Sequence, residues 1–333
     1  MKNLKLLVVG TGSIGKRHIK NAISLGIKPK NILAVDTQKK RLNEVKILGL
    51  NKVFENFDQA LKEDFHAAII CSPTSLHIKQ SIQLAKRKKH ILIEKPLDSN
   101  LNGSKKLIRL TKDNKLSIMI AYIFRFSEPI KFIKREILKN SIGKILYFRG
   151  EFSEYLPDWH PYEDYRTFYM ASKKQGGGSI LDQCHIMDLA HFLIGSFSSV
   201  QAVNYKISNL KINADDFSEM IIKHKNGVVS SIHTDIFGRS HKKILEIKGE
   251  KGNISWDFYK NEVKIFNSKN RKEKLFNKFN KNFNDFYIDE LSHFINCFKN
   301  KKKPKVSLED GVHTMKLILS AEKSQRTGKE EKV

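Results

Sequence analysis

The first third of the chain alternates short apolar runs with longer stretches of helical periodicity. The apolar runs, which predict buried strands, cover residues 4–9, 32–35, 67–71, 91–93 and 117–121. Between them, apolar residues recur at helical spacing, as in the stretch that starts at Ile14 and in Leu101–Lys112. Strands that alternate with helices predict a doubly wound parallel sheet, and we assign this α/β domain to residues 1–122.

The pattern changes after a predicted helix at Glu128–Lys139. From Lys144 onward, longer stretches alternate apolar and polar residues, as half-buried antiparallel strands do. These predicted strands are Ile145–Phe152, Val200–Ser208, Asp216–His224, Val228–Phe237, Lys242–Lys248, Gly252–Asp257 and Glu262–Asn267. Short glycine-containing loops join several of them, so we expect a large, open, mostly antiparallel sheet of about six strands.

Two further predicted helices, Phe283–Lys299 and Leu308–Gln325, complete an α+β domain over residues 123–325. Residues 268–282 are rich in lysine and asparagine and are expected to form a mobile loop. Residues 326–333 are expected to form a charged, frayed tail. The second domain is therefore predicted to offer one face of an open sheet to a substrate.

The chain carries a formal net charge of +26 over 333 residues. Such a charge is compatible with a nucleic-acid partner. However, lysine is spread over the whole chain, and there is no helix-turn-helix, zinc knuckle or basic-aromatic stripe. We therefore interpret the charge as solvated surface and expect no nucleic-acid partner, although it still favours anionic small molecules.

The sequence gives no signal for a membrane or an oxidised compartment. No run of about 18 apolar residues occurs, and the apolar start at Leu4–Val9 is too short for a signal peptide. The three cysteines, Cys71, Cys184 and Cys297, are isolated, which argues against a disulfide framework or a zinc ribbon. We expect a cytoplasmic protein without a metal site.

A glycine-rich turn follows the first strand directly. It reads Gly10-Thr11-Gly12-Ser13-Ile14-Gly15 and opens a predicted helix. In a strand–turn–helix context, the three glycines allow a tight turn, a close approach to a pyrophosphate and close helix packing, while the helix N-terminus attracts phosphate. The turn, with Ser13 and Ile14, therefore predicts a dinucleotide site.

Asp36 ends the second strand, about twenty residues after the last glycine, where a carboxylate binds the ribose hydroxyls. This favours NAD as the cofactor. The nearby Lys39, Lys40 and Arg41 keep NADP open, and a helix cap is the structural alternative for Asp36.

Two later strand ends belong to the same predicted crevice, because ligands bind outside the carboxyl ends of parallel strands. Ser72, Pro73 and His77 follow the strand at 67–71, on the predicted nicotinamide side. Glu94, Lys95 and Pro96 follow the strand at 91–93, and the proline stiffens the turn that carries Lys95. By itself, Glu-Lys-Pro is more often a solvated surface loop than a site.

In the second domain, three glycines at 176–178 precede a helical pattern that contains Asp182 and His185. Glycines in a row are costly unless the backbone must bend sharply or approach a ligand. A carboxylate three residues before an imidazole can orient the ring, so the pair predicts acid–base chemistry, with a purely structural pair as the alternative. No third ligand at suitable spacing supports a metal site.

The segment 155–166 supplies aromatic side chains that could stack on a sugar ring and Arg166 for an anionic group. Trp159 is its candidate stacking residue. The alternative is an interdomain packing loop.

Taken in order, these motifs resemble the glucose–fructose oxidoreductase, inositol dehydrogenase and MocA (Gfo/Idh/MocA) family. The matching stretches are GTGSIG, SPTSLH, HILIEKPL, Phe124-Arg125-Phe126 and GGGSILD with the following His185 and Asp188. The segment 155–166 also resembles a subset of the family linked to surface-glycan sugars.

The resemblance implies a Rossmann domain, a bound NAD(P), an open-sheet domain and assembly into dimers or tetramers through that sheet. It matches Lys95 and His185 to the family lysine and histidine, Arg125 to the substrate site, and Asp182 to the family aspartate. Many members place three residues between the aspartate and the histidine, whereas this chain has two.

The function expected from residues and resemblance together is hydride transfer between nicotinamide and a secondary hydroxyl or ketone of a sugar, nucleotide sugar or cyclitol. His185 would take the hydroxyl proton, and Lys95 would stabilise the developing alkoxide. Two alternatives stay open: an enzyme that recycles its NAD during glycoside cleavage or epimerisation, and a non-catalytic NAD-binding sensor.

Overall fold

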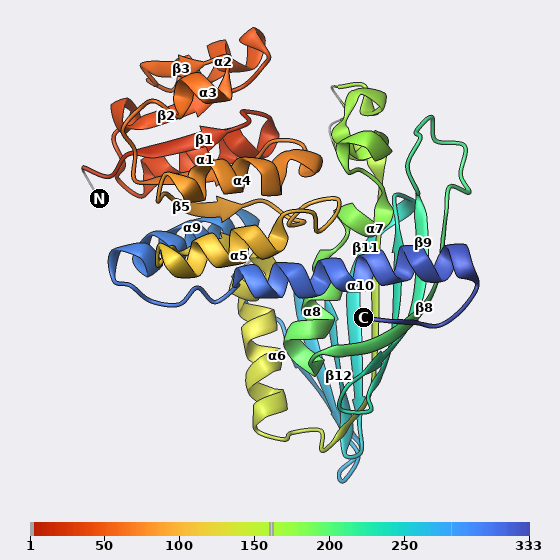
Figure 1. Cartoon of the computed structure of the whole chain (residues 1–333). Helices are drawn as coiled ribbons and strands as arrows, with labels where there is room; N and C mark the ends of the chain where they lie inside the picture. Colours follow the sequence, from red (N-terminus) through yellow and green to blue (C-terminus); the bar gives the residue numbers. More distant parts are fainter. Residues whose placement is uncertain (1–2, 160, 162, 281) are drawn as a thin grey trace. The chain divides into compact units, whose positions relative to one another are not determined.

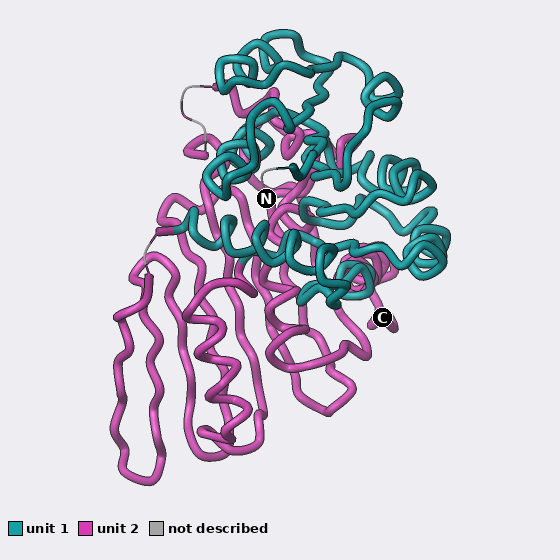
Figure 2. The backbone as a smooth tube through the Cα atoms, turned by 90° about the vertical axis from the view of Figure 1, so that its left-hand side faces the viewer, with its two compact units in different colours: residues 1–123, 283–312 teal, residues 124–282, 313–333 magenta. Residues whose placement is uncertain are grey.

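The computed structural model describes residues 3–159, 161, 163–280 and 282–333 (Figure 1). It divides into two compact units, drawn in different colours in Figure 2. Unit 1 comprises residues 1–123 and 283–312, and unit 2 comprises residues 124–282 and 313–333. In the described part of the chain, no helix has the length and apolar character needed to cross a membrane.

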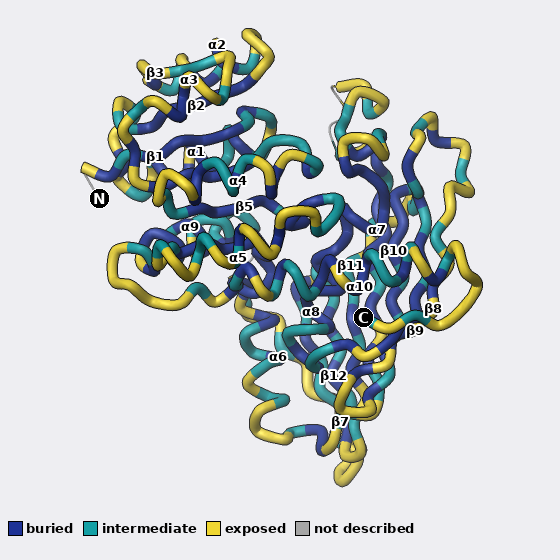
Figure 3. The backbone as a smooth tube through the Cα atoms, viewed as in Figure 1, coloured by how far each residue is buried: buried dark blue, intermediate teal, exposed yellow. Residues whose placement is uncertain are grey.

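Unit 1 is built on a parallel sheet of six strands in the order β3-β2-β1-β4-β5-β6. Its strands are β1 (Leu6–Val9), β2 (Ile32–Val35), β3 (Lys52–Phe54), β4 (Ala67–Ile70), β5 (His90–Ile93) and β6 (Ile118–Ile120). Every residue of β1, β2 and β4 is buried, which accounts for their continuous apolar runs (Figure 3). The sequence did not predict β3, because this edge strand has no buried residue and no apolar run.

Helices connect the strands of this sheet. They are α1 (Ser13–Ser24), α2 (Lys39–Lys46), α3 (Phe57–Ala60), α4 (His77–Lys86) and α5 (Ser104–Asp113). The short 3-10 turns η1 (Pro29–Asn31) and η2 (Thr74–Leu76) precede β2 and α4, and a third, η3 (Ile123–Phe126), begins at the last residue of this first stretch of unit 1. The strand order reverses between β1 and β4, which is where an open parallel sheet of this kind binds its ligand. The predicted doubly wound fold is confirmed.

Helix α9 (Phe283–Lys299) belongs to unit 1, although the sequence placed it in the second domain. It packs against α1 and buries Leu291, Phe294 and Ile295. The start of α10 (Leu308–Thr327) also belongs to unit 1, where the side chain of Ile120 lies against Gly311. These contacts join residues more than 170 positions apart, so no local pattern could reveal them.

Unit 2 is built on a sheet of nine strands in the order β14-β13-β12-β11-β7-β10-β9-β8-β15. Its strands are β7 (Ile145–Tyr155), β8 (Phe197–Tyr205), β9 (Phe217–His224), β10 (Val229–Asp235), β11 (Phe237–Gly249), β12 (Gly252–Asp257), β13 (Glu262–Asn267), β14 (Lys272–Phe276) and β15 (Glu331–Lys332). All neighbours pair antiparallel except β7 and β10, which run parallel.

Two of these strands correct the sequence prediction. Residues 272–276, expected in a mobile loop, form β14 and pair with β13. Residues 331–332, expected in a frayed tail, form β15 and pair with β8. Both segments are mostly polar and carry no apolar alternation, and pairing with a neighbouring strand gives partners to their backbone groups.

Helices pack on one face of this sheet, and buried residues alternate with more exposed ones along β8, β9 and β10. The helices of unit 2 are α6 (Glu128–Leu138), α7 (Ser179–Asp182), α8 (His185–Ile194) and the later part of α10. Four short 3-10 turns lie between β7 and α7: η4 (Leu156–Asp158), η5 (Tyr165–Thr167), η6 (Tyr169–Ala171) and η7 (Lys173–Gln175). Helix α8 packs on β7 and β10, and α7 packs on β9 and β10.

Candidate functional site

The glycine turn after β1 has the tight geometry that the motif predicts. Gly10 has a φ of 90°, and a Cβ there would lie 2.5 Å from the carbonyl oxygen of Cys71, which follows β4. A Cβ on Gly15 would lie 2.0 Å from the carbonyl oxygen of Gly10. Glycine is thus required at both positions by the packing of the chain itself.

Gly12 differs from these two glycines, because apart from its chain neighbours the nearest atom that a Cβ there would meet is Arg41 Nη1, at 3.8 Å. It lies directly before Ser13, the first residue of α1, whose first turn has no side-chain cap and no acidic residue. Open space at a glycine next to free, positively polarised N–H groups fits a bound pyrophosphate. Gly12, Ser13 and Ile14 would hold it there.

Asp36 lies at the end of β2 with 8% of its surface exposed, and its carboxylate is fixed. Its Oδ2 accepts a hydrogen bond from the backbone N of Thr11 at 2.7 Å, and its Oδ1 accepts one from Gln38 N at 2.9 Å. Arg41 Nη1 lies 3.9 Å from Oδ2. Asp36 therefore ties the glycine turn to the end of β2, and its contact with a ribose stays a prediction.

The loop after β4 is held by His77, whose two ring nitrogens each lie 2.9 Å from a carbonyl oxygen. Nδ1 contacts Pro96 O, and Nε2 contacts Ser72 O. Ser72 Oγ donates to Gln80 Oε1 at 2.6 Å, and Pro73 precedes the 3-10 turn η2. His77 thus joins the loops after β4 and β5, and its contact with a cofactor stays a prediction.

Glu94 and Lys95 follow β5, and Glu94 is anchored from two sides. Its Oε1 lies 2.8 Å from Nε2 of the fully buried His18, and its Oε2 accepts a hydrogen bond from the backbone N of Lys95 at 3.2 Å. Lys95 itself is partly exposed. The structure therefore places Lys95 at the carboxyl end of the sheet on a braced loop, as the sequence predicted.

Helix α9 adds two residues to this part of unit 1 that the sequence analysis missed. Glu290 is fully buried, and its carboxyl oxygens have no hydrogen-bond partner among the described residues. Burial and the charge of Glu94 raise the pKa of Glu290 well above its ordinary value. Burial likewise raises the pKa of Tyr287, whose ring meets His18 edge-on. In the sequence, the signal for Glu290 was a glutamate among the apolar positions of this helix, next to Leu291 and four residues after Phe286.

In unit 2, the three glycines form a sharp turn between β7 and α7. Gly176 and Gly178 have φ values of 80° and 119°. A Cβ on Gly177 would lie 2.3 Å from Tyr169 O, and one on Gly178 would lie 2.3 Å from Asp215 Oδ1. The turn therefore requires glycine for its own backbone and packing.

The turn presents Asp182 and His185, which are both buried, with 6% and 9% of their surfaces exposed. Asp182 Oδ1 accepts a hydrogen bond from Tyr169 Oη at 2.9 Å. His185 lies edge-on to Phe124, with 5.1 Å between the ring centroids. The sequence predicted one continuous helix here, but α7 ends at Asp182 and α8 begins at His185.

Gln183, one of the two residues between these helices, connects to a polar network that the sequence analysis did not predict. Gln183 Nε2 donates to Glu154 Oε2 at 3.1 Å, and Glu154 Oε1 accepts from Lys243 Nζ at 2.5 Å and Tyr259 Oη at 2.7 Å. Burial alone would raise the pKa of Glu154, but these donors outweigh it and the pKa is lowered. The sequence signal for this network was a glutamate two residues after Phe152, on the same inward face of β7.

Arg125, predicted as a substrate residue, lies in a buried ion pair. Its Nη2 and Nε donate to Asp188 of α8 at 2.6 and 2.9 Å, and its guanidinium lies 4.9 Å from the centre of the Phe192 ring. These contacts give Arg125 a structural role, while contact with a substrate stays a prediction.

The other two predicted substrate residues lie on the segment before the glycines. Trp159 packs against a buried cluster formed by Leu156, Met170, Leu210 and Ile236. Arg166 is exposed and bound to Asp164, with Nη2 2.5 Å from Oδ2. His160 and Tyr162 of the same segment lie outside the described residues.

Within the described ranges, no three His, Cys, Asp or Glu side chains gather in a way that could hold a metal ion. Lys95 lies in unit 1, and Asp182 and His185 lie in unit 2. The convergence of the three side chains on one substrate therefore stays a prediction.

A parallel sheet with a glycine turn at its switch point, followed by an open-sheet unit with a buried aspartate–histidine segment, defines a two-domain dinucleotide-dependent enzyme. The chain belongs to the Gfo/Idh/MocA family of oxidoreductases. Residues 4–122 match its "NAD-binding Rossmann fold" and residues 134–333 match its "C-terminal alpha/beta domain". The resemblance seen in the sequence and the prediction of NAD as cofactor are both confirmed.

Curated relatives cover nearly the whole chain. Myo-inositol 2-dehydrogenase of Thermotoga maritima is 28% identical over 96% of both chains. The NAD-dependent scyllo-inositol 2-dehydrogenase of Bacillus subtilis is 27% identical over 98% of this chain and 95% of its own. Among solved structures, levoglucosan dehydrogenase in complex with NADH and levoglucosan is 21% identical, with a TM-score of 0.88 over all of both chains.

Asp215 gives a test of how the glycine turn is held. Its Oδ2 accepts a hydrogen bond from Ile180 N at 3.0 Å, and burial raises its pKa from 3.8 to about 6. The folded state favours the neutral carboxyl. The contribution of Asp215 to the free energy of unfolding is therefore complete below pH 3.8 and is lost as the pH rises through about 6.

We therefore expect Asp215→Asn, which keeps an acceptor for Ile180 but cannot ionise, to gain stability relative to wild type as the pH rises. The relative gain should reach about 3 kcal/mol at most by pH ~8. Urea unfolding of both proteins at acidic, neutral and mildly alkaline pH measures it. Parallel stability curves would show that Asp215 titrates normally.

Proposed function

We propose that this protein oxidises a secondary hydroxyl of a sugar or cyclitol, or reduces the corresponding ketone, with NAD as the hydride carrier. The main support is the buried Asp182–His185 segment. It follows a sharp turn at two glycines with positive φ, and Tyr169 donates a hydrogen bond to Asp182. The protein's similarity to inositol dehydrogenases and levoglucosan dehydrogenase supports a sugar or cyclitol as the substrate.

In this proposal each residue has a separate task. NAD, when bound, supplies the hydride acceptor. His185 takes the hydroxyl proton, and Asp182 keeps the imidazole in the required orientation. Lys95 stabilises the negative charge that develops on the substrate oxygen, since an ammonium group aimed at that atom strengthens its hold as the charge grows.

The test is NADH formation when the purified protein and NAD meet a panel of myo-inositol, scyllo-inositol, levoglucosan, uronates and nucleotide sugars. A steady release of NADH with at least one of them supports the proposal. Conversion of a substrate without NADH release would instead establish the NAD-recycling alternative. NAD binding without conversion of any of them would favour the sensor.

We further propose that the chain assembles as a homodimer or homotetramer through the solvent-facing side of the unit 2 sheet. Val203, Tyr205 and Ile221 are 44 to 51% exposed there, on the neighbouring strands β8 and β9. Apolar side chains gathered on one face are typical of a contact surface. Light scattering after gel filtration tests this, and a monomer at micromolar concentration would reject it.

A further inference from the structure

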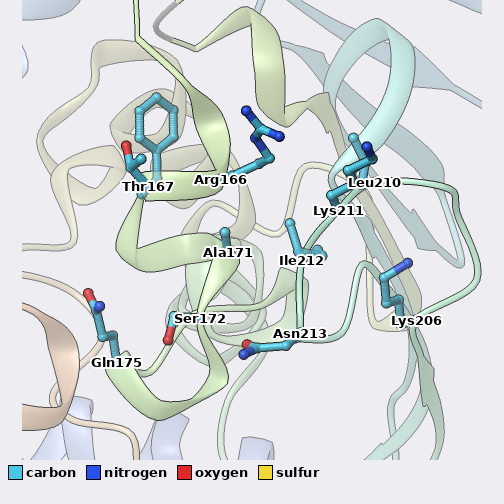
Figure 4. Close-up of a pocket in the computed structure, with 11 residues that line it drawn as sticks. Arg166, Thr167, Ala171, Ser172, Gln175, Lys206, Leu210, Lys211, Ile212 and Asn213 are labelled. Carbon is cyan, nitrogen blue, oxygen red and sulfur yellow. The ribbon is translucent and has the colours of Figure 1, made fainter.

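Unit 2 contains a cavity of about 740 Å³ that none of the acid–base residues lines. One wall is the segment of 3-10 turns from Arg166 to Gln175, and the other is the loop from Lys206 to Asn213 (Figure 4). Its size lies within the range of small-molecule sites, which runs from about 300 to 1,000 Å³. The cavity therefore has room for more than a single ion.

The two walls are tied to each other by hydrogen bonds between backbone and polar groups. Lys211 N donates to Tyr165 Oη at 3.1 Å, Asn213 N donates to Ala171 O at 3.0 Å, and Lys173 N donates to Asn213 Oδ1 at 2.9 Å. Leu210 and Ile212 of the loop also pack in the apolar cluster that contains Met170. The cavity is thus a built feature of the unit rather than a gap between free loops.

The polar lining is cationic. Arg166, Lys206 and Lys211 all line the cavity, together with the hydroxyls of Thr167 and Ser172. Asp164 offsets one positive charge through Nε and Nη2 of Arg166 and leaves Nη1 outside that pair. Lys206 Nζ donates to Ser208 O, and neither lysine is paired with a carboxylate in the described part of the chain.

We propose that this cavity binds the phosphate groups of a phosphorylated substrate, either a sugar phosphate or a nucleotide-diphosphate sugar. Two lysines and an arginine with free donors, spread over such a volume, suit several phosphate oxygens better than one carboxylate. The Ser172 hydroxyl can donate to the same oxygens, whereas the Thr167 hydroxyl donates to Asp164 O at 2.8 Å.

The position of the cavity relative to Asp182 connects it to the proposed reaction. Phe168 and Ala171 line the cavity, and between them Tyr169 donates its hydroxyl to Asp182. Tyr169 thus links the cavity wall to Asp182, and the proposal is that a phosphate held at this wall places the sugar at the acid–base segment. This inference rests on the proposed function, because it names the substrate class of the same site.

Isothermal titration of the whole protein with inorganic phosphate, pyrophosphate and UDP tests the proposal. Saturating NADH is kept present so that the cofactor's own phosphate site is filled. Lys211→Gln and Arg166→Gln remove one charge each from the cavity. Lys225→Gln, in the exposed hairpin between β9 and β10, removes the same charge elsewhere and serves as the control.

We expect pyrophosphate or UDP to bind, and each cavity variant to weaken that binding by about tenfold or more, as the loss of a charged hydrogen bond does. The Lys225→Gln variant should bind as wild type does. Tighter binding of UDP than of pyrophosphate would identify a nucleotide-diphosphate sugar, and equal binding a sugar phosphate. No binding at millimolar concentration, or equal affinity in all variants, overturns the proposal.

The same proteins separate this inference from the proposed function. Rapid NADH formation from an uncharged cyclitol, with no binding of any phosphate probe, would reject phosphate binding by the cavity and support the proposed dehydrogenase activity. Binding of UDP without NADH formation from any phosphorylated sugar or cyclitol would support phosphate binding by the cavity and reject the proposed dehydrogenase activity.

Discussion

Lys95→Met is expected to reduce the turnover number by a factor of about 10² to 10⁴, the usual contribution of a positioned proton-transfer or charge-stabilising group. Methionine keeps the length and the apolar stem of lysine but has no charge. The loop should keep its position, because Glu94 holds it through His18 and the Lys95 backbone, which the substitution leaves in place. NADH formation on the sugar or cyclitol that the wild type oxidises measures the effect.

The control is the affinity for NAD, which should stay within a few-fold of wild type, because the pyrophosphate site lies on the glycine turn and not on the lysine. Lys105→Met, at an exposed position of α5, provides the matched loss of charge and should behave as wild type. If Lys95→Met retained turnover within a few-fold of wild type, Lys95 would have no catalytic role.

Asp188→Ala is expected to cost about 3–5 kcal/mol in the free energy of unfolding, because it leaves the buried Arg125 guanidinium without its carboxylate. Both side chains of the pair are at most 5% exposed, so water cannot replace the lost partner. Urea unfolding of the two proteins at neutral pH measures the difference.

The double variant Arg125→Met, Asp188→Leu removes both charges and should lose much less stability, since no charge is then buried alone. The same variant also tests the predicted substrate role of Arg125. If it folds and its kcat/KM falls sharply while its NAD affinity holds, Arg125 contacts the substrate. If the double variant were as unstable as Asp188→Ala, the ion pair would not be the reason for the loss.

Much of unit 1 could be read from the sequence, because its signals are local. A strand buried on both faces must be apolar throughout, and β1, β2 and β4 are. Gly10 and Gly15 are required by backbone contacts within the strand–turn–helix unit and with the end of β4. The position of Lys95 followed from the end of one such strand.

Other features had local signals that pointed to more than one outcome. The three glycines of unit 2 predicted a sharp turn, and the turn is there. The helical periodicity that follows did not show that the helix breaks between Asp182 and His185. Gln183 lies in that break and donates a hydrogen bond to Glu154, which lies 29 residues earlier on β7.

The sequence by itself determined the fold class, the glycine turn, the family and the cofactor, since each depends on residues that are neighbours along the chain. The tertiary structure alone decided that α9 joins unit 1, that β14 and β15 extend the sheet, and that Tyr169 braces Asp182. It also brought Lys206 and Lys211 opposite Arg166 around one cavity. These contacts depend on chain segments that meet only in the folded state, where burial and hydrogen bonding outweigh local preference.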